Sequence, residues 1–519
     1  MRPISAATLR GWIQDGHELA ILDAREEGEF GRAHLFWSVN VPLSRAELLL
    51  PALLPNPRTR VVCVDDETGP AHRLALLVER MGGSDVSVLE GGTRAWAECG
   101  AAAGYVLFSG VNVPSKAFGE WVEHHYGTES VDAPELDAWM RSGRKMVVLD
   151  SRPMEEFRAM SIPSGIDVPG GELVYRIGDL APDPETLVVV NCAGRTRSIL
   201  GAESLRRARI PNRVVALRNG TMGWQLAGFQ AARGESATYP SGRPASADLA
   251  LQRAEAFAAE AGVRRIESAT LAGFAADETR TLHLLDVRAP DEFAAGHAPG
   301  TLSAPGGQLV QATDRWIAVR GARLVLVDDD GVRAAMTGAW LRLMGHRDVY
   351  TIRMADLPSL PRLRIPVLPL VESVAPQQIG PGTPILDVSR SLAFRAGHVP
   401  GSLWGVRTRL APVCARLAGA AEVVVTSEDG RLAALAAAEV AALSGARVRV
   451  MAGGMAAWRD AGLALAADRT TPPDEACVDV YLRPYDRNSG VEAAMREYLS
   501  WEVDLVREIE RDGTVRFGV

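Results

Sequence analysis

Residues 186–198 read TLVVVNCAGRTRS and are followed by ILGAESLRRA at 199–208. The short β-branched run is typical of a strand buried on both faces, and the residues after Ser198 predict a helix. Cys192 therefore lies in the loop between a predicted strand and the N-terminal end of a predicted helix. Because free backbone N–H groups at a helix N-terminus favour an anion, this loop is the candidate centre of the chain's chemistry.

The same strand–loop–helix pattern occurs three more times along the chain. TRVVCVDDE (59–67), ARLVLVDDDG (322–331) and EVVVTSEDG (422–430) are each followed by a predicted helix. In every unit an earlier apolar run ends in an aspartate, with a phenylalanine seven residues later. These pairs are Asp23 and Phe30, Asp150 and Phe157, Asp286 and Phe293, and Asp387 and Phe394. The residues aligned at the loop position are Asp66, Cys192, Asp329 and Glu428.

Strands that alternate with helices over about 100 residues predict parallel βαβ units, so the expected fold class is α/β with four tandem domains. Each domain is expected to be a parallel sheet flanked by helices. The predicted divisions are a domain at 1–104, a linker at 105–129, a domain at 130–236, a degenerate domain at 250–362, a domain at 364–468 and a tail at 469–519. A helix is predicted at 490–511 within the tail.

The composition is that of an ordinary globular protein. The chain has 519 residues, of which 47% are apolar and 23% charged, and this excludes disordered and collagen-like classes. A net charge of −8 and the lack of a long basic run argue against nucleic acid as a partner. No run of about 18 apolar residues predicts a membrane span. Since the first residues also lack a signal-peptide pattern, we expect a cytoplasmic protein without a membrane partner.

The five cysteines are dispersed, and their positions are Cys63, Cys99, Cys192, Cys414 and Cys477. An odd number without a C-x-x-C pair argues against a disulfide framework and against a zinc site. We therefore predict no metal site. Cys63 falls inside a predicted strand, and the others except Cys192 miss the loop position, so we expect these four to be unreactive.

Three motifs recur in the same order along the units: D-x-R-x-x-x-E-F, G-H-x-P-G, and a closing G-G-x-x-x-W. Their order and spacing resemble tandem rhodanese domains, which have the sulfurtransferase fold. The set of four units is similar to a class of long bacterial multi-rhodanese proteins. The residues that form the motifs are Asp23, Arg25, Glu29 and Phe30, Asp150, Arg152, Glu156 and Phe157, Asp286, Arg288, Glu292 and Phe293, residues 296–300 and 397–401, and Trp96, Trp224 and Trp458.

The resemblance implies a two-step, ping-pong transfer through a persulfide on the loop cysteine, which only the second unit has. The implied donor is thiosulfate or a related small molecule, and the implied acceptor is a thiol or cyanide, with a protein sulfur acceptor as a further candidate. Neither a metal nor an organic cofactor is implied. The implied site residues are Cys192 as nucleophile, Gly194, Arg195, Thr196, Arg197 and Ser198 around the donor, and Asp150 and Arg152 in support.

The loop is expected to favour the Cys192 thiolate. A free thiol with a pKa of about 8.5 is only a few per cent ionised at neutral pH, whereas helix-end cysteines beside cations have a pKa of about 3.5 to 7.5. Arg195 and Arg197 provide two such cations, and they also attract an anionic donor. Many single-domain relatives have glycine where this chain has Arg195, so the sequence leaves the donor preference open.

Two other functions fit the same loop. A rhodanese-like phosphatase would carry C-x5-R around a larger oxyanion, whereas Cys192 and Arg197 form C-x4-R, which favours sulfur transfer. A persulfide carrier or an interaction scaffold would instead use the three units without the loop cysteine to bind partner proteins.

Residues at the loop position of the other units have a structural interpretation. Asp66, Asp329 and Glu428 cannot form a persulfide, and a carboxylate there would stabilise a helix N-terminus. Asp150 and Arg152 have counterparts in units without the cysteine. We therefore expect these two to form an ion pair that braces the strand end and the loop.

The segment at 109–129 precedes the second unit and is predicted to be an exposed linker helix. The alternative is that Lys116, His124 and His125 line the mouth of the Cys192 site.

Overall fold

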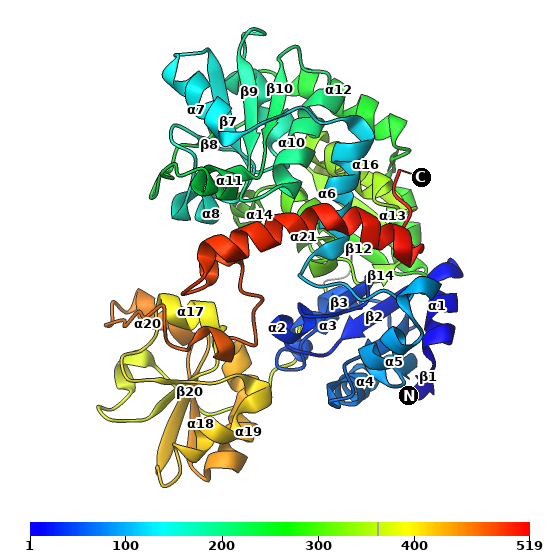
Figure 1. Ribbon diagram of the computed structural model, residues 1–519. Helices are drawn as coiled ribbons and strands as arrows, with labels where there is room; N and C mark the ends of the chain where they lie inside the picture. Colours follow the sequence, from blue (N-terminus) through cyan, green and yellow to red (C-terminus); the bar gives the residue numbers. More distant parts are fainter. Residues whose placement is uncertain (361–362, 519) are drawn as a thin grey trace.

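The computed structural model describes residues 1–360 and 363–518, and it contains four β-sheets, one for each predicted unit (Figure 1). Strands that belong to the same unit pair in parallel, and helices flank each sheet. This confirms the α/β class and the four tandem units. The predicted ends of the third domain and of the tail, residues 362 and 519, lie outside the described residues.

The first unit has the strand order β1-β5-β4-β2, with β3 on the outer side of β2. Every residue of β2 is buried, as expected for a strand covered on both faces. Its elements are β1 (Arg2–Ile4), α1 (Ala6–Gln14), β2 (Leu19–Asp23), α2 (Glu27–Phe30), β3 (Ser38–Asn40), α3 (Ala46–Leu53), β4 (Arg60–Val64), α4 (Pro70–Arg80), β5 (Asp85–Leu89), α5 (Gly92–Glu98) and η1 (Ala101–Ala103).

The second unit follows a helix, α6, and has the strand order β6-β10-β9-β7-β8. The VVV run lies in β9 at the centre of this sheet. The elements are α6 (Val113–Tyr126), β6 (Ser130–Val131), α7 (Ala133–Arg141), β7 (Met146–Asp150), α8 (Met154–Ala159), β8 (Ile166–Asp167), α9 (Leu173–Leu180), β9 (Leu187–Asn191), α10 (Thr196–Arg207), β10 (Val214–Leu217) and α11 (Gly220–Leu226).

The third unit has the order β11-β16-β15-β12-β13, and a short 3-10 turn, η3, replaces the helix that closes the other units. This difference agrees with the sequence of this unit, which has no G-G-x-x-x-W motif after its last strand. Its elements are α12 (Ala247–Glu260), β11 (Arg264–Arg265), α13 (Ser268–Ala276), β12 (Leu282–Asp286), α14 (Pro290–Ala295), β13 (Leu302–Ser303), α15 (Gly306–Gln311), η2 (Thr313–Arg315), β14 (Val319–Arg320), β15 (Arg323–Asp328), α16 (Val332–Leu343), β16 (Val349–Arg353) and η3 (Met354–Asp356).

The fourth unit has the order β17-β21-β20-β18-β19 and is followed by the tail. The helix predicted at 490–511 is present as α21. The elements are β17 (Ser373–Val374), η4 (Pro376–Gln378), β18 (Ile385–Asp387), α17 (Ser391–Ala396), β19 (Leu403–Trp404), η5 (Arg407–Arg409), α18 (Ala411–Ala415), β20 (Glu422–Thr426), α19 (Arg431–Ser444), β21 (Arg447–Met451), α20 (Gly454–Asp460), η6 (Asp474–Ala476), η7 (Pro484–Asp486) and α21 (Val491–Asp512).

The strand register corrects the predicted loop alignment. The aspartate at the end of the first long strand of each unit pairs with Val64, Asn191, Val327 or Thr426, respectively. The next residue in each unit is the structural equivalent of Cys192, and these residues are Asp65, Cys192, Asp328 and Ser427. The predicted Asp66, Asp329 and Glu428 are each one residue too late. The error arose where the loop begins with consecutive polar residues, because composition alone does not show which of them follows the last paired residue.

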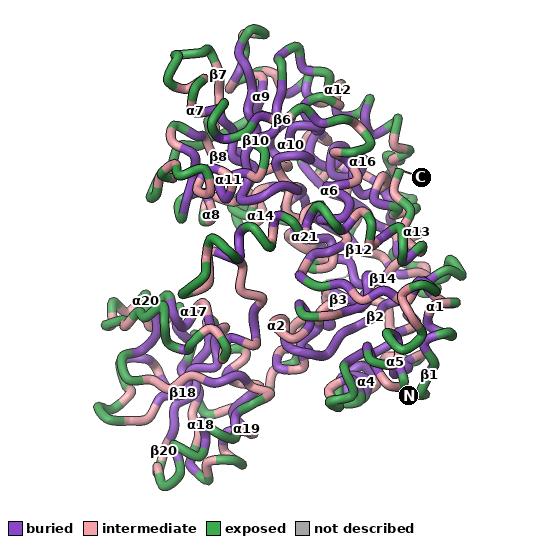
Figure 2. Tube along the Cα trace, in the orientation of Figure 1, coloured by how far each residue is buried: buried purple, intermediate pink, exposed green. Residues whose placement is uncertain are grey.

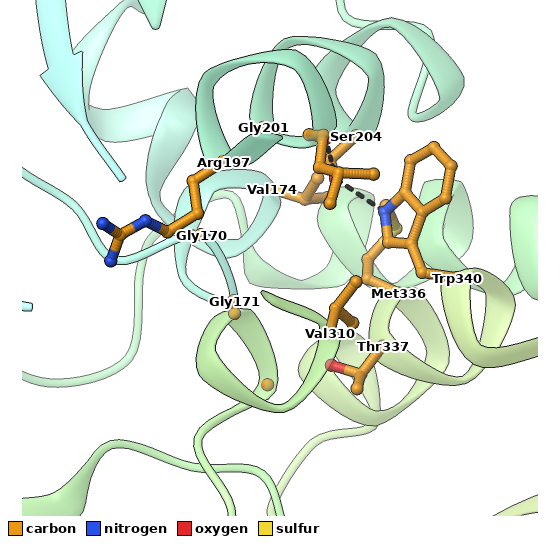
Figure 3. Close-up of a pocket in the computed structure, with 13 residues that line it drawn as sticks. Gly170, Gly171, Val174, Arg197, Gly201, Ser204, Val310, Met336, Thr337 and Trp340 are labelled. Carbon is orange, nitrogen blue, oxygen red and sulfur yellow. Dashed lines mark hydrogen bonds between the residues drawn. The ribbon is translucent and has the colours of Figure 1, made fainter. Parts of the chain in front are cut away.

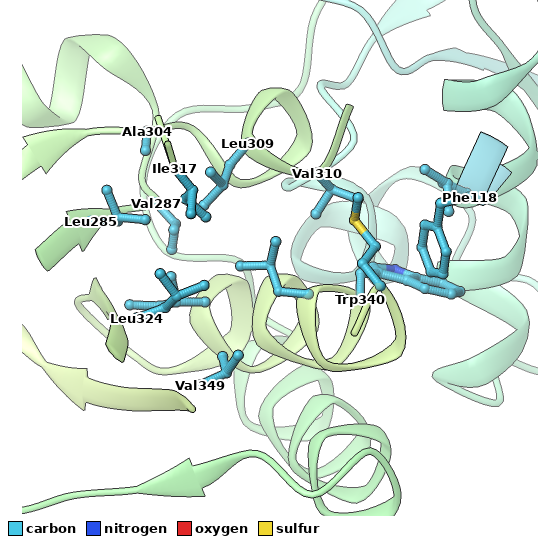
Figure 4. Packing of buried hydrophobic residues seen from close by; sticks show 14 of the residues in the cluster. Phe118, Leu285, Val287, Ala304, Leu309, Val310, Ile317, Leu324, Trp340 and Val349 are labelled. Atoms are coloured by element: carbon cyan, nitrogen blue, oxygen red, sulfur yellow. The ribbon is translucent and has the colours of Figure 1, made fainter. Parts of the chain in front are cut away.

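The first three units share one hydrophobic core, and within it the second and third units pack together around α16 (Figure 4). Trp340 of α16 lies edge-on to Phe118 of α6 and Phe257 of α12, with ring centroids 5.9 Å and 5.1 Å away. Its indole N–H donates to the hydroxyl of Ser204 in α10 at 2.8 Å. Figure 2 shows buried residues running from the strands of the second unit into α10 and α6. The two units are therefore packed as one body.

The first and third units are joined by a strand. β14 of the third unit pairs antiparallel with β2 of the first, with Val319 opposite Ala20 and Arg320 opposite Leu19. The first sheet thus has six strands, one of them from another unit. Among the described residues, no helix is long and apolar enough to cross a membrane.

Buried histidines make stability depend on pH. His283 of β12 is 1% exposed, and both ring nitrogens lack a hydrogen-bond partner among the described residues. Burial lowers its pKa to about 4. Its pKa is about 6.5 in an unfolded chain, so unfolding takes up a proton between these values, and stability is lost as the pH falls from about 6.5 towards 4.

We predict that His283→Leu reduces this acid sensitivity. Between pH 7.5 and pH 5 the variant's free energy of unfolding, from urea denaturation, should fall by about 2 kcal/mol less than that of the wild type. His72→Gln, at an exposed position of α4, should follow the wild type. Parallel pH profiles for wild type and His283→Leu would contradict the prediction.

Candidate active site

Cys192 lies at the end of β9 and directly before the loop that begins α10. Its residue is 2% exposed, and its Sγ atom is within hydrogen-bond distance of the hydroxyl of Ser198, 3.6 Å away in the first turn of α10. The Ser198 hydroxyl also donates to the carbonyl of Arg195 at 2.8 Å. The expected position of Cys192 between strand and helix is therefore present, with Ser198 beside the sulfur.

The backbone of the Cys192 loop is fixed by the start of α11. The N–H and the hydroxyl of Thr221 donate to the Cys192 carbonyl at 2.8 Å and 3.0 Å, and the N–H of Met222 donates to the Ala193 carbonyl at 2.9 Å. Gly220 has a φ of +53°, and a Cβ on it would lie 2.2 Å from the Cys192 carbonyl oxygen. Only glycine fits there, which explains the glycine in the closing motif.

The expected ion pair between Asp150 and Arg152 is present beneath the loop. The guanidinium Nε and Nη2 of Arg152 donate to the two carboxylate oxygens of Asp150 at 2.8 Å and 2.7 Å, and both residues are buried. The Asn191 amide donates to the same carboxylate at 2.7 Å, and Arg152 also donates to the Met160 carbonyl. The pair therefore joins the ends of β7 and β9 to the turn after α8.

Arg197 is the loop arginine whose charge interacts with Cys192. Its guanidinium donates to both carboxylate oxygens of Glu156, at 3.0 Å and 2.7 Å. Burial opposes its charge, but Glu156 and Cys192 outweigh burial and raise the Arg197 pKa. Burial would likewise raise the pKa of Glu156, but the Arg197, Arg483 and Arg152 charges lower it to about 2. Glu156 is the acid of the D-x-R-x-x-x-E-F motif, so the motif already contained the ion-pair partner of Arg197.

Arg195 is directed away from the sulfur and towards α6. Its Nε and Nη2 donate to the two carboxylate oxygens of Glu120, both at 2.7 Å, and Nη2 also contacts Glu123. The Arg195 residue is 9% exposed, so its charge is compensated inside the protein. Of the two predicted arginines, Arg197 is the one whose charge interacts with Cys192, and Arg195 is held on α6.

The helix predicted at 109–129 is present as α6, but the prediction that it is exposed is wrong. Gly119 of α6 lies so close to α10 that a Cβ on it would be 2.8 Å from the side chain of Thr196. Lys116 is buried beside the loop, whereas His124 and His125 are exposed near the end of the helix. The helix is buried because α10 and α21 both pack on it.

The tail helix α21 also covers the Cys192 loop. Met495 and Leu499 of α21 pack in one cluster with Ala193 and Met222. In Figure 1, α21 runs between the second unit and the first and fourth units. The sequence analysis missed this contact, because the tail lies outside the repeat and contains no motif that refers to the loop.

The second and third units meet at a small cavity beside α10 (Figure 3). Figure 3 shows Arg197 at one side of the cavity, with its guanidinium pointing away, and Trp340 at the other. The two backbones touch where a Cβ on Gly171 would lie 2.9 Å from the amide nitrogen of Gly307. The third unit thus packs against α10 and the Gly170–Gly171 turn at this cavity.

Comparison with known proteins identifies the repeated unit. A family model described as the rhodanese-like domain matches residues 5–99, 132–227, 272–354 and 372–461. The chain belongs to the rhodanese-like family. A solved structure of thiosulfate sulfurtransferase from Pseudomonas aeruginosa is 43% identical to this rhodanese-like chain, with a TM-score of 0.91 and 100% of each chain covered. An HTH-type transcriptional regulator from Mycobacterium tuberculosis is 33% identical over 90 residues, which cover 17% of this chain and 38% of that protein.

Two of the rhodanese-like units that lack a cysteine in the loop hold a carboxylate at the position equivalent to Cys192. Asp65 accepts hydrogen bonds from the N–H groups of Glu67, Gly69 and Ala71 at 2.9–3.0 Å. Asp328 accepts from two loop and helix N–H groups at 2.8 Å and 3.0 Å. The stabilising role expected of a carboxylate at this helix end is therefore present, but one residue earlier than predicted.

We predict that Gly220→Ala disrupts the Cys192 loop. A residue with a positive φ costs about 1 kcal/mol when it acquires a Cβ, and the clash with the Cys192 carbonyl adds about 1–3 kcal/mol. Gly228→Ala is the matched control, because Gly228 has a φ of +86° and nothing within 4 Å of its Cβ position. Urea denaturation should show the larger loss for Gly220→Ala, and equal losses in the two variants would contradict the clash.

Proposed function

We propose that this chain is a sulfurtransferase in which Cys192 takes sulfane sulfur from thiosulfate, or a related anionic donor, and passes it to a thiol or cyanide. The observation that carries the proposal is the position of Cys192 alone among the four equivalent loop residues, buried beside Ser198 and Arg197 at the start of α10. A full-length relative named as a thiosulfate sulfurtransferase supports the choice of donor.

Atoms and electrons balance in both steps of the sulfur transfer without a cofactor. The Cys192 thiolate attacks the outer sulfur of thiosulfate, a new S–S bond forms, and sulfite leaves with the electron pair of the broken bond. Cyanide or a thiolate then attacks the outer sulfur of the persulfide and releases the Cys192 thiolate. Arg197 and the N–H groups of residues 194–197 stabilise the anions of both steps, because charge-assisted hydrogen bonds are strongest in a site shielded from water.

The remaining predicted residues hold this arrangement in place. Asp150 and Arg152 fix the strand ends, and Arg195 anchors the loop on α6. We further propose a cytoplasmic location, because all five cysteines are free, as is typical of a reducing compartment.

Intact-mass analysis after incubation with thiosulfate tests the reaction. We expect a gain of one sulfur atom that a reductant removes and that Cys192→Ser lacks. Steady turnover to thiocyanate supports an enzyme, whereas a stoichiometric persulfide without turnover on cyanide or small thiols would indicate a carrier. Unmodified mass in the wild type, or release of phosphate from an aryl phosphate, would overturn the proposal.

We predict that Arg197→Met slows the reaction with subsaturating thiosulfate by about tenfold or more, because it removes the cation beside the sulfur. The single variant also leaves Glu156 without its main partner, so Arg197→Met/Glu156→Gln is measured beside it and should be equally slow. Arg213→Met, which removes an exposed ion pair of the same unit, should react at the wild-type rate. Wild-type rates in both Arg197 variants would contradict the assigned role.

A further inference from the structure

Two segments outside the four matched domains meet at the Cys192 loop. The family match omits the residues of α6 and of α21, and both helices pack beside the start of α10. Figure 1 shows α21 crossing α6 next to α10. These helices place a buried pair of opposite charges, Lys116 and Glu502, against the loop.

Three donors converge on one carboxylate oxygen of Glu502. The Lys116 ammonium lies 2.6 Å from Oε1, the Tyr498 hydroxyl donates to it at 3.2 Å, and the Thr196 hydroxyl at 3.3 Å. The side chains of Lys116 and Glu502 are only 7% and 2% exposed. Thr196 is the first residue of α10, so this network connects the tail to the helix that begins beside Cys192.

The second oxygen of Glu502 faces the loop without a partner among the described residues. Oε2 is buried and makes no hydrogen bond, and a Cβ on Gly194 would lie 3.2 Å from it. A carboxylate charge at this place opposes ionisation of a nearby thiol. Lys116 supplies the opposite charge, and its ammonium also lies 4.8 Å from the centre of the Tyr498 ring.

Other charged and titratable groups face the same region. Those that interact with Glu502 are Lys116 and Glu120 of α6, Arg195 of the loop, and Tyr481 and Tyr498 of the tail. Beside Cys192 is Arg197, which in turn interacts with Glu156 and Tyr485. Because Arg195 and Arg197 are already paired with Glu120 and Glu156, Lys116 is the direct counter-charge of Glu502.

We propose that Glu502 and Lys116 are positioning residues for the sulfur transfer. Glu502 holds Thr196 and the start of α10, and Lys116 cancels the carboxylate charge so that the Cys192 thiolate is not opposed. This inference rests on the proposed function. It assigns the tail and the helix before the second unit a part in an active site that the repeated domain alone does not complete.

The test compares Lys116→Met, Glu502→Gln and the double variant in the full chain. The readout is the pH midpoint for alkylation of Cys192 by iodoacetamide, measured by mass spectrometry of the Cys192 peptide. Lys116→Met leaves an uncompensated carboxylate and should raise the midpoint by about one pH unit. Glu502→Gln leaves an uncompensated ammonium and should lower it, and the double variant should return close to the wild type.

Shifts of the alkylation midpoint in opposite directions distinguish a charge role from a structural one. A loosened loop would shift the midpoints of both single variants in the same direction. If Lys116→Met does not fold, Glu502→Gln and the double variant still decide the matter, since the double variant must have the higher midpoint. Lys116→Arg should retain the wild-type midpoint, and so should Lys145→Met, which breaks an exposed pair.

Shifts of equal sign in the two single variants, no shift, or a double variant level with Glu502→Gln would overturn the inference. Persulfide formation by the wild type is measured separately with thiosulfate. Its absence would overturn the proposed function, whereas the order of the alkylation midpoints tests the charge balance at Cys192 independently.

Discussion

The hydrogen bonds to the Cys192 carbonyl are the interaction on which the site depends. Thr221 holds that carbonyl from the start of α11, and this requires the close approach that Gly220 permits. Because the carbonyl is fixed, the side chain of Cys192 must point to the start of α10. The same contact recurs where Gly92 approaches the carbonyl of Asp65. The repeated unit therefore presents one side chain to a helix N-terminus, and in the second unit that side chain is the thiol of Cys192.

The charges around this turn are arranged in pairs. Arg197 is held by Glu156, Arg195 by Glu120, and Lys116 by Glu502. Buried charges are costly unless they are paired, and pairing also limits how many of these groups act on the sulfur. Of these three cations, Arg197 is the one whose charge interacts with Cys192.

Much of this structure follows from the sequence because its signals are local. Alternating apolar runs, the aspartates at strand ends and the tail helix each depend on neighbours within one unit or one helix. The predicted loop alignment was wrong by one residue in three units. Consecutive polar residues such as Asp65 and Asp66 cannot be told apart from composition, and only the strand pairing shows which of them follows the last paired residue. The partners of Arg195 and Thr196 could not be predicted, because Glu120 and Glu502 come from segments far apart in the chain and share no motif.

The strand that the third unit adds to the first sheet has a consequence for protein synthesis. During translation the edge of β2 emerges about 300 residues before Val319 and Arg320, the residues that will cover it. Until then the first sheet presents unpaired backbone groups, the kind of edge that invites wrong pairing with other chains. The first sheet of the nascent polypeptide therefore keeps part of this edge uncovered until residues 319 and 320 have been synthesised.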